Sequence, residues 1–186
     1  MKITLKMGLL FAFIWFAIKL IFHFGGWIKT DINPTILLNM LLLLLAISIG
    51  LYLHKKQEGF TAGNALSDIK AAMTAGIPYA ILVSIFVYVY YAQINPEFVQ
   101  QRISDAEMTI KMSLDDPEMF QKIKNEQEAF EVMTKEAIFE ELKTGPANFY
   151  SAKSTAIIGL LGMTLLSTLY SIFVTIIYRR VLFRKL

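Results

Sequence analysis

Three residues of this sequence could do chemistry inside an apolar environment: Lys19, His23 and Asn39. Lys19 and His23 lie four residues apart in one apolar run, so a helix places both on one face. Asn39 lies at a similar depth in the next run. An ionisable side chain within a membrane helix suggests a site, here for an anion or a lipid phosphate. The alternative, which we favour, is that Lys19 extends its ammonium about 7–8 Å to the lipid headgroups.

The familiar signatures of catalysis and metal binding are missing. The sequence has no Gly-x-Ser-x-Gly elbow, no glycine-rich phosphate loop, no His-Glu-x-x-His helix and no cysteine. Its two histidines are predicted on opposite sides of a membrane and so cannot share a metal. The acidic pairs Asp115-Asp116 and Glu140-Glu141 do not fit the twelve-residue calcium loop and are typical of a solvated helix surface. We therefore expect no catalytic site, no metal site and no cofactor.

Composition indicates that the elements carrying these residues lie in a lipid bilayer. Hydrophobic residues make up 55% of the 186-residue chain and charged residues only 18%. These are too few polar residues to cover the surface of a soluble enzyme. The net charge of +3 does not indicate nucleic acid, because the basic residues flank apolar runs and form no face of their own. Crossing a bilayer takes about 20 apolar residues in a helix. Four runs have that length, at about residues 7–24, 34–53, 71–92 and 155–178.

Basic residues beside these runs predict the orientation of the chain. On the side that holds both termini, nine Lys or Arg residues accompany two acidic ones. The segment 93–150 has six basic and twelve acidic residues, and so a net charge of −6. Since cytoplasmic flanks are enriched in Lys and Arg, we predict that both termini are cytoplasmic and that this acidic segment lies outside. The residues that set this topology include Lys55, Lys56, Arg179, Arg180, Arg184 and Lys185.

Small residues predict where the helices meet, because close backbone approach drives helix association in lipid. Two stripes of small residues, one in the third run and one in the fourth, are expected to face each other. Pro78 should bend the third run, and we favour a static bend over a gating hinge. The residues expected to pack are Ala72, Gly76, Ala80, Ser84, Gly159 and Gly162.

The acidic segment is too long to lack secondary structure. Residues 95–97 (Asn-Pro-Glu) and 116–118 (Asp-Pro-Glu) each combine a capping side chain, a proline at the first helical position and an acid at the positive helix end. They predict helices over about 96–112 and 117–143, the second closed by Gly145 and the proline after it. The apolar face of the second helix could bind a partner, lie on the membrane or pack on the first helix, and we favour packing.

Three short motifs make the sequence similar to a known family. They are residues 59–63 (GFTAG), 75–79 (AGIPY) and 91–98 (YAQINPEF). The chain resembles, over nearly its whole length, the domain of unknown function 4199 family of four-span membrane proteins, found mainly in one group of Gram-negative bacteria. The resemblance implies four spans and a location in the inner membrane. It implies no activity and no catalytic residue.

The expected fold is an all-α integral membrane four-helix bundle, a single domain over residues 1–186, with a two-helix extracytoplasmic insertion between spans three and four. The first functional hypothesis is a non-enzymatic structural or partner-binding protein that acts through its acidic outer helices. The alternative is a small oligomeric transporter or channel lined by the polar faces of spans three and four. Expected partners are the lipid bilayer, a protein bound to the outer segment and further copies of the chain; nucleic acid is not expected.

Overall fold

The computed structural model describes residues 2–26, 33–126 and 128–182, and within these ranges it contains helices and no strand. The chain divides into two compact units. One unit comprises residues 1–86 and 157–186, and we call it the apolar unit. The other comprises residues 87–156, and we call it the acidic unit. The prediction of an all-α protein is confirmed for the described part of the chain.

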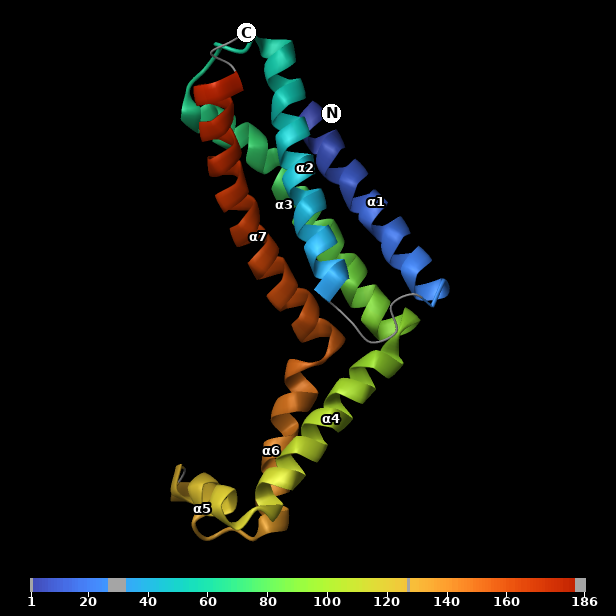
Figure 1. The fold of residues 1–186 in the computed structure, drawn as a ribbon, viewed down its shortest axis with the longest axis vertical. Helices are drawn as coiled ribbons and strands as arrows, with labels where there is room; N and C mark the ends of the chain where they lie inside the picture. The colour runs from blue at the N-terminus through green and yellow to red at the C-terminus, as the bar shows by residue number, and fades with distance from the viewer. Residues whose placement is uncertain (1, 27–32, 127, 183–186) are drawn as a thin grey trace. The chain divides into compact units, whose positions relative to one another are not determined.

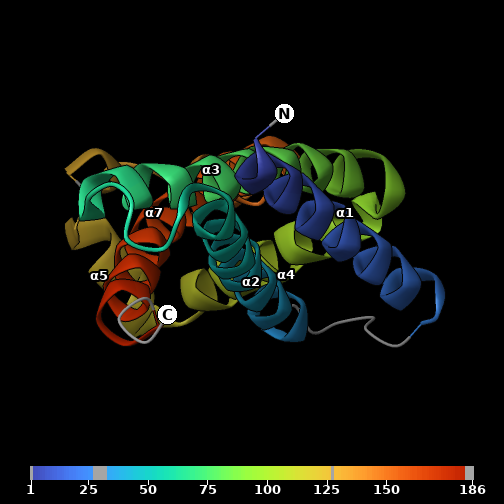
Figure 2. The same cartoon turned by 90° about the horizontal axis from the view of Figure 1, so that it is seen from above.

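Four long helices supply the apolar unit. Each is long and apolar enough to cross a membrane, which confirms the four predicted spans and fits an integral membrane protein. Figures 1 and 2 agree that α2 lies between α1 and α7, with α3 behind it (Figure 1, Figure 2). The four helices are α1 (Ile3–Phe24), α2 (Asn33–Glu58), α3 (Ala65–Val89) and α7 (Ala152–Ile177).

A short turn with two glycines reverses the chain between α2 and α3. Gly59 and Gly63 both adopt positive φ, at 100° and 69°, a region that side chains with a Cβ rarely occupy. Asn64 and Ser67 then cap α3 reciprocally, since Asn64 Oδ1 accepts from the Ser67 amide at 2.9 Å and Ser67 Oγ accepts from the Asn64 amide at 3.0 Å. The turn thereby brings the last turn of α2 beside the first turn of α3.

Helix α3 is closely approached by both α1 and α7. A Cβ added at Gly8 of α1 would lie 2.2 Å from the Ala75 carbonyl oxygen of α3. A Cβ added at Gly76 would lie 1.9 Å from Ser167 Oγ of α7. Ala75 and Gly76 are adjacent in sequence, so α3 presents one position to α1 and the next to α7. Pro78 lies inside α3 and does not end it.

The packing expected of Gly159 and Gly162 is corrected by the structure. A Cβ added at either glycine would meet nothing within 4 Å. Small residues permit a close approach but do not require one, and α7 reaches α3 further along its length. The buried residues of α3 include the whole predicted stripe, whereas those of α7 lie in its second half: Ala72, Gly76, Ala80 and Ser84 on α3, and Ser167, Ser171, Val174 and Thr175 on α7.

The acidic unit has more helices than predicted. Its elements are a π-helical turn (Tyr90–Ile94), α4 (Pro96–Asp115), α5 (Pro117–Glu126), a 3-10 turn (Glu128–Phe130) and α6 (Lys135–Phe149). The single helix expected over 117–143 is therefore wrong. The chain leaves the helix after α5 and re-enters it after Thr134, whose Oγ1 accepts from the Ala137 amide at 3.3 Å.

This break builds the core of the acidic unit. Phe130 is buried together with Leu114 of α4 and Ile138 of α6, and Phe120 and Ile123 of α5 pack against them. In one straight helix Phe130 and Ile138 would lie about 12 Å apart along the axis and could not both pack against Leu114. The apolar face of this region packs within the unit, as we favoured.

The predicted helix signals of the acidic unit are confirmed in part. Asp116 caps α5, since its Oδ1 accepts from the amides of Glu118 at 2.9 Å and Met119 at 3.2 Å. Helix α4 begins at Pro96 as predicted, but the Asn95 side chain makes no capping hydrogen bond. The predicted end at Gly145 is wrong, because this glycine is not among those with positive φ and α6 continues for four more residues.

Candidate functional site

Three charged side chains from three helices meet at one end of the apolar unit. Lys55 lies in the last turn of α2, Asp68 in the first turn of α3, and Arg179 in the π-helical turn Tyr178–Leu182 that continues α7. Lys55 Nζ lies 3.1 Å from Asp68 Oδ1, and Arg179 Nε donates to Asp68 Oδ2 at 2.7 Å. We call these three residues the charge cluster. Each carboxylate oxygen of Asp68 therefore pairs with a cation from a different helix.

Two of the three side chains of the charge cluster are buried and the third is partly exposed. Lys55 is 0% exposed, Asp68 is 2% exposed and the Arg179 side chain is 30% exposed. Lys55 Nζ also donates to the carbonyl oxygen of Ala62, in the turn between α2 and α3. Burial of an ion costs several kcal/mol, which only close pairing and full hydrogen bonding can offset. The cluster therefore joins three helix ends and the turn between α2 and α3.

The helix ends favour this distribution of charge. A cation is stabilised near a helix C-terminus and an anion near a helix N-terminus by the helix dipole. Lys55 occupies the first kind of position and Asp68 the second, and the turn between the two helices sets them face to face. Arg179 lies at the C-terminal end of α7, so its charge is also favoured by its own helix.

The charge cluster terminates two stripes with four-residue spacing, one on α3 and one on α7. We call this pair of stripes the α3–α7 seam, and it contains the approach of Ser167 to Gly76. The sequence analysis assigned Lys55 and Arg179 to topology and did not include Asp68 among the candidate residues. Asp68 lies four residues before Ala72 and so continues the spacing of the predicted α3 stripe. The seam consists of Asp68, Ala72, Gly76, Ala80 and Ser84 on α3, and of Ser167, Ser171, Thr175 and Arg179 on α7.

The interior of the seam is polar but sparingly hydrogen-bonded. Ser171 Oγ donates to the Ser167 carbonyl oxygen of its own helix at 2.7 Å. The hydroxyls of Ser84, Ser167 and Thr175 are buried and have no hydrogen-bond partner among the residues that the structure describes. Between the Asp68–Arg179 pair and the close approach of Ser167 to Gly76, no hydrogen bond from these hydroxyls joins the two helices, so close packing is the interaction left to hold them there.

Asn39 belongs to a different contact from the one predicted. Tyr79 Oη donates to Asn39 Oδ1 at 2.6 Å and to the Asn39 carbonyl oxygen at 3.2 Å. Asn39 Nδ2 in turn lies 3.8 Å from the sulfur of Met163. Among the described residues, its hydrogen bonds thus go to α3 and α7, and the structure does not join Asn39 to Lys19 and His23 on α1. The expected cluster is corrected to a contact between three helices.

The residues assigned to topology differ in their surroundings. Lys55 is buried in the charge cluster, whereas its neighbour Lys56 is exposed. Arg179 is half-buried and its neighbour Arg180 is exposed. The last two residues of that set, Arg184 and Lys185, lie outside the described part of the chain. Of the four that the structure describes, Lys55 and Arg179 therefore hold helices together as well as carrying positive charge.

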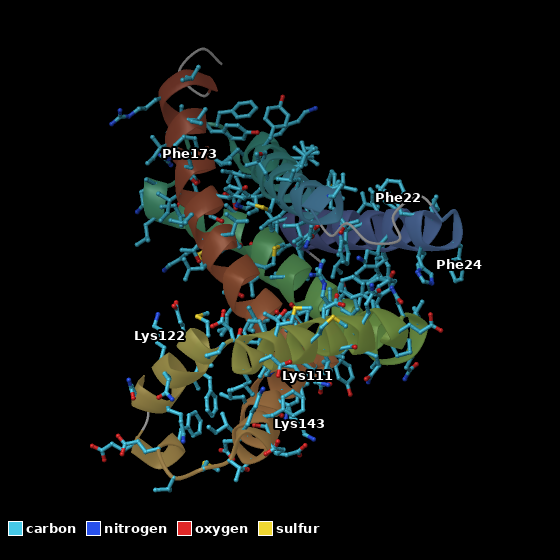
Figure 3. The ribbon with its side chains drawn as sticks, turned by 60° about the horizontal axis from the view of Figure 1, so that its bottom comes forward. Phe22, Phe24, Lys111, Lys122, Lys143 and Phe173 are labelled. Atoms are coloured by element: carbon cyan, nitrogen blue, oxygen red, sulfur yellow. The ribbon has the colours of Figure 1, made fainter. Side chains whose placement is uncertain are left out.

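The acidic unit has a shallow hollow of roughly 380 Å³ between α4 and α6. Lys135 donates to Asp115 at its edge, and this hydrogen bond with the nearby ammonium charge lowers the pKa of Asp115. Lys111 and Phe139 also line it. Figure 3 labels Lys111, Lys122 and Lys143 on the helices of this unit. The hollow is a solvated, mixed-charge surface.

Comparison with known proteins identifies a family and no activity. A family model described as "Protein of unknown function (DUF4199)" matches residues 6–180. No curated protein and no solved structure matches the chain.

Proposed function

We propose that this chain, which belongs to the DUF4199 family of unknown function, is a non-enzymatic membrane anchor that binds a basic protein partner through its acidic unit. The apolar unit holds the chain in the bilayer. The acidic unit carries the binding surface.

The exposure of the acidic side chains supports this proposal most strongly. Twelve of the fifteen acidic residues of the chain lie in the segment 93–150. Ten of the eleven whose side chains the structure describes are exposed. Two of them pair with lysines, Asp115 with Lys135 and Glu140 with Lys143. The remaining surface favours a partner of opposite charge, through faster encounter and through selection against acidic proteins.

An apolar row on α4 supplies a second kind of contact. Met108 and Met112 are spaced by one helical turn and are 57% and 64% exposed. Methionine side chains are flexible and polarisable, so they adapt to partners of different shape. Acidic residues around an exposed apolar row are typical of an interface whose centre is apolar and whose rim is charged.

The proposal also includes the orientation of the chain in the membrane. We infer that both termini lie in the cytoplasm and that the acidic unit lies outside, in a bacterial inner membrane. The support is the excess of Lys and Arg beside the spans on the side of the termini.

A transporter or channel would need a polar path across the apolar unit. The α3–α7 seam contains buried hydroxyls, but Ser167 Oγ lies where a Cβ of Gly76 would be, so the two helices leave no passage at that level. This packing disfavours conduction through the seam of one chain. Flux measured in proteoliposomes would test an oligomeric path.

The experiment uses site-directed photo-cross-linking of the full chain in native membranes. Since the chain has no cysteine, Met112→Cys can carry a photo-cross-linker at a single position. A discrete heavier adduct is expected, and adding Glu136→Gln, Glu140→Gln and Glu141→Gln should weaken it several-fold.

Two controls make the cross-linking result decisive. Leu165→Cys places the same probe on a 66% exposed residue of α7, where only lipid adducts are expected. Lys122→Gln changes one charge of the acidic unit in the opposite sense and should not weaken the adduct. An adduct that is absent at residue 112, or that ignores the acidic residues, contradicts the proposed function.

A further inference from the structure

The charge cluster carries one positive charge more than its own residues neutralise. Two cations, Lys55 and Arg179, share the single carboxylate of Asp68. The nearby acid Glu58 is engaged elsewhere, since its Oε2 lies 3.2 Å from Nε2 of His54. A buried charge without a counterion is costly, so the surplus charge requires an anion or solvent at the exposed side of the cluster.

Arg179 is the residue of the cluster that can contact an anion balancing this surplus positive charge. Lys55 is fully buried, forms an ion pair with Asp68 and donates to the Ala62 carbonyl. Arg179 donates from its Nε to Asp68, its Nη2 is buried without a hydrogen-bond partner among the described residues, and its side chain as a whole is 30% exposed. Asp68 therefore holds the Arg179 guanidinium in a fixed orientation, and the guanidinium keeps N–H groups that can donate to an anion. A planar guanidinium prepared in this way matches the geometry of a phosphate group.

The depth of the cluster indicates the source of the anion. Lys55 lies near the end of the candidate span Pro34–Glu58, Asp68 near the start of Ala65–Ile94, and Arg179 near the end of Ala152–Val181. The ends of membrane-spanning helices lie at the level of the lipid headgroups. Exposed Lys56 and Arg180 add to the positive potential there, which attracts anionic lipid.

We propose that the charge cluster binds one phosphate group through Arg179, and that this phosphate belongs to the headgroup of an anionic lipid. The phosphate completes an alternating arrangement in which Lys55 and Arg179 flank Asp68 and the anion follows Arg179. The phosphate site does not require a partner bound to the acidic unit, so the test of this site is independent of the test of the proposed function.

Thermal unfolding of the full chain in neutral detergent tests this site. The probes are phosphatidylglycerol, phosphatidylcholine and inorganic phosphate, each added over a range of concentrations. A ligand that binds only the folded protein raises the Tm by mass action. We expect phosphatidylglycerol to raise the Tm of the unmodified protein, and phosphatidylcholine, whose choline neutralises its phosphate, to raise it much less.

Arg179→Gln removes the surplus charge and leaves the Lys55–Asp68 pair intact. It should lose at least half of the rise caused by phosphatidylglycerol. Lys56→Gln removes one exposed positive charge from the same end of the protein and should keep the rise. Equal rises in these two variants, or equal losses, would show that the lipid responds only to overall charge and would overturn the site.

Two further arms keep the proposal testable. Should Arg179→Gln fail to fold, Arg179→Lys keeps a cation beside Asp68 but loses the guanidinium fork, and its rise should be smaller than that of the unmodified protein. An undiminished rise in Arg179→Lys would overturn the role of the guanidinium. A rise with inorganic phosphate equal to that with phosphatidylglycerol would keep the phosphate site and overturn the lipid as its source.

Discussion

At the scale of single residues, Asp68 stands out because its two oxygens pair with cations on two other helices. It is also the only acid of the cluster, so its removal leaves a fully buried lysine with no counterion. Breaking a buried ion pair on one side is far more damaging than replacing the whole pair, since the remaining charge keeps its desolvation cost.

Asp68→Asn should therefore lower the free energy of unfolding by about 3–5 kcal/mol. Chemical unfolding in detergent measures the change. Glu58→Gln serves as the control, because Glu58 is an acid at the same end of the protein but 55% exposed, and its loss should cost about 1 kcal/mol or less. Comparable losses in both variants would contradict the importance of burial.

Lys19 allows a second residue-scale prediction. If its ammonium only reaches the lipid headgroups, Lys19→Gln should leave the free energy of unfolding unchanged or raise it, because a charge is withdrawn from apolar surroundings. The Tm rise with phosphatidylglycerol should equal that of the unmodified protein. A rise confined to the unmodified protein would instead show that Lys19 binds an anion.

At the scale of elements, α3 connects the apolar unit because α1 and α7 approach it at adjacent positions. The approaches differ in what they meet. The Cβ position of Gly8 falls on a backbone oxygen of α3, which cannot move without shifting the helix, whereas that of Gly76 falls on the end of a serine side chain. The same addition should therefore be more costly at Gly8 than at Gly76.

Gly8→Ala and Gly76→Ala should each lower the free energy of unfolding by about 1–3 kcal/mol, with Gly8→Ala the larger. Gly162→Ala, which meets open space, is the matched control and should be close to neutral. Adding Ser167→Ala to Gly76→Ala should recover part of the loss, since it removes the oxygen that the new Cβ meets at 1.9 Å. Unfolding in detergent measures all four; a costly Gly162→Ala would contradict the observed packing.

The core of the acidic unit gives a further element-scale prediction. Phe130 is 4% exposed among residues from α4 and α6, so Phe130→Ala should cost about 3–5 kcal/mol of local stability. Hydrogen exchange of the amides in α4 and α6 measures this as lost protection. Val132→Ala, at a residue that is 91% exposed, should leave the protection unchanged. Equal protection in the two variants would show that Phe130 does not support the unit.

At the scale of the whole molecule, the apolar and acidic units differ in the solvent they suit. The apolar unit exposes large aliphatic and aromatic side chains, such as Leu165 and Phe173 on α7, as a lipid-facing surface requires. Figure 3 labels Phe173 on this helix. The acidic unit exposes charge, which is expensive in lipid. One chain therefore requires two environments, and the excess of basic residues beside the spans predicts which side the acidic unit occupies.

Reporter fusions test that orientation directly. A reporter after Leu186 or near Gly59 should be active in the cytoplasm, and one near Asn125 should be active outside. The reason is the basic excess on the terminal side and the net charge of −6 in the segment 93–150. Cytoplasmic activity of the fusion near Asn125 would reverse the orientation.

The sequence by itself determined the features that depend on neighbouring residues. Four spans follow from the length and hydropathy of continuous runs, and the cap at Asp116 follows from a hydrogen bond that reaches only two or three residues. Both kinds of feature are set by interactions within one helix or one turn. They can therefore be predicted without knowing which helices become neighbours.

Only the tertiary structure decided which distant residues meet. Asp68 and Arg179 are 111 residues apart, and no local pattern predicts that one carboxylate will pair with both Lys55 and Arg179. Gly76 and Gly162 are equally small, yet only Gly76 is covered, because coverage depends on where α7 crosses α3. The free energy that selects such contacts comes from packing and from pairing of desolvated charges, and both require that the partner helix is already in place.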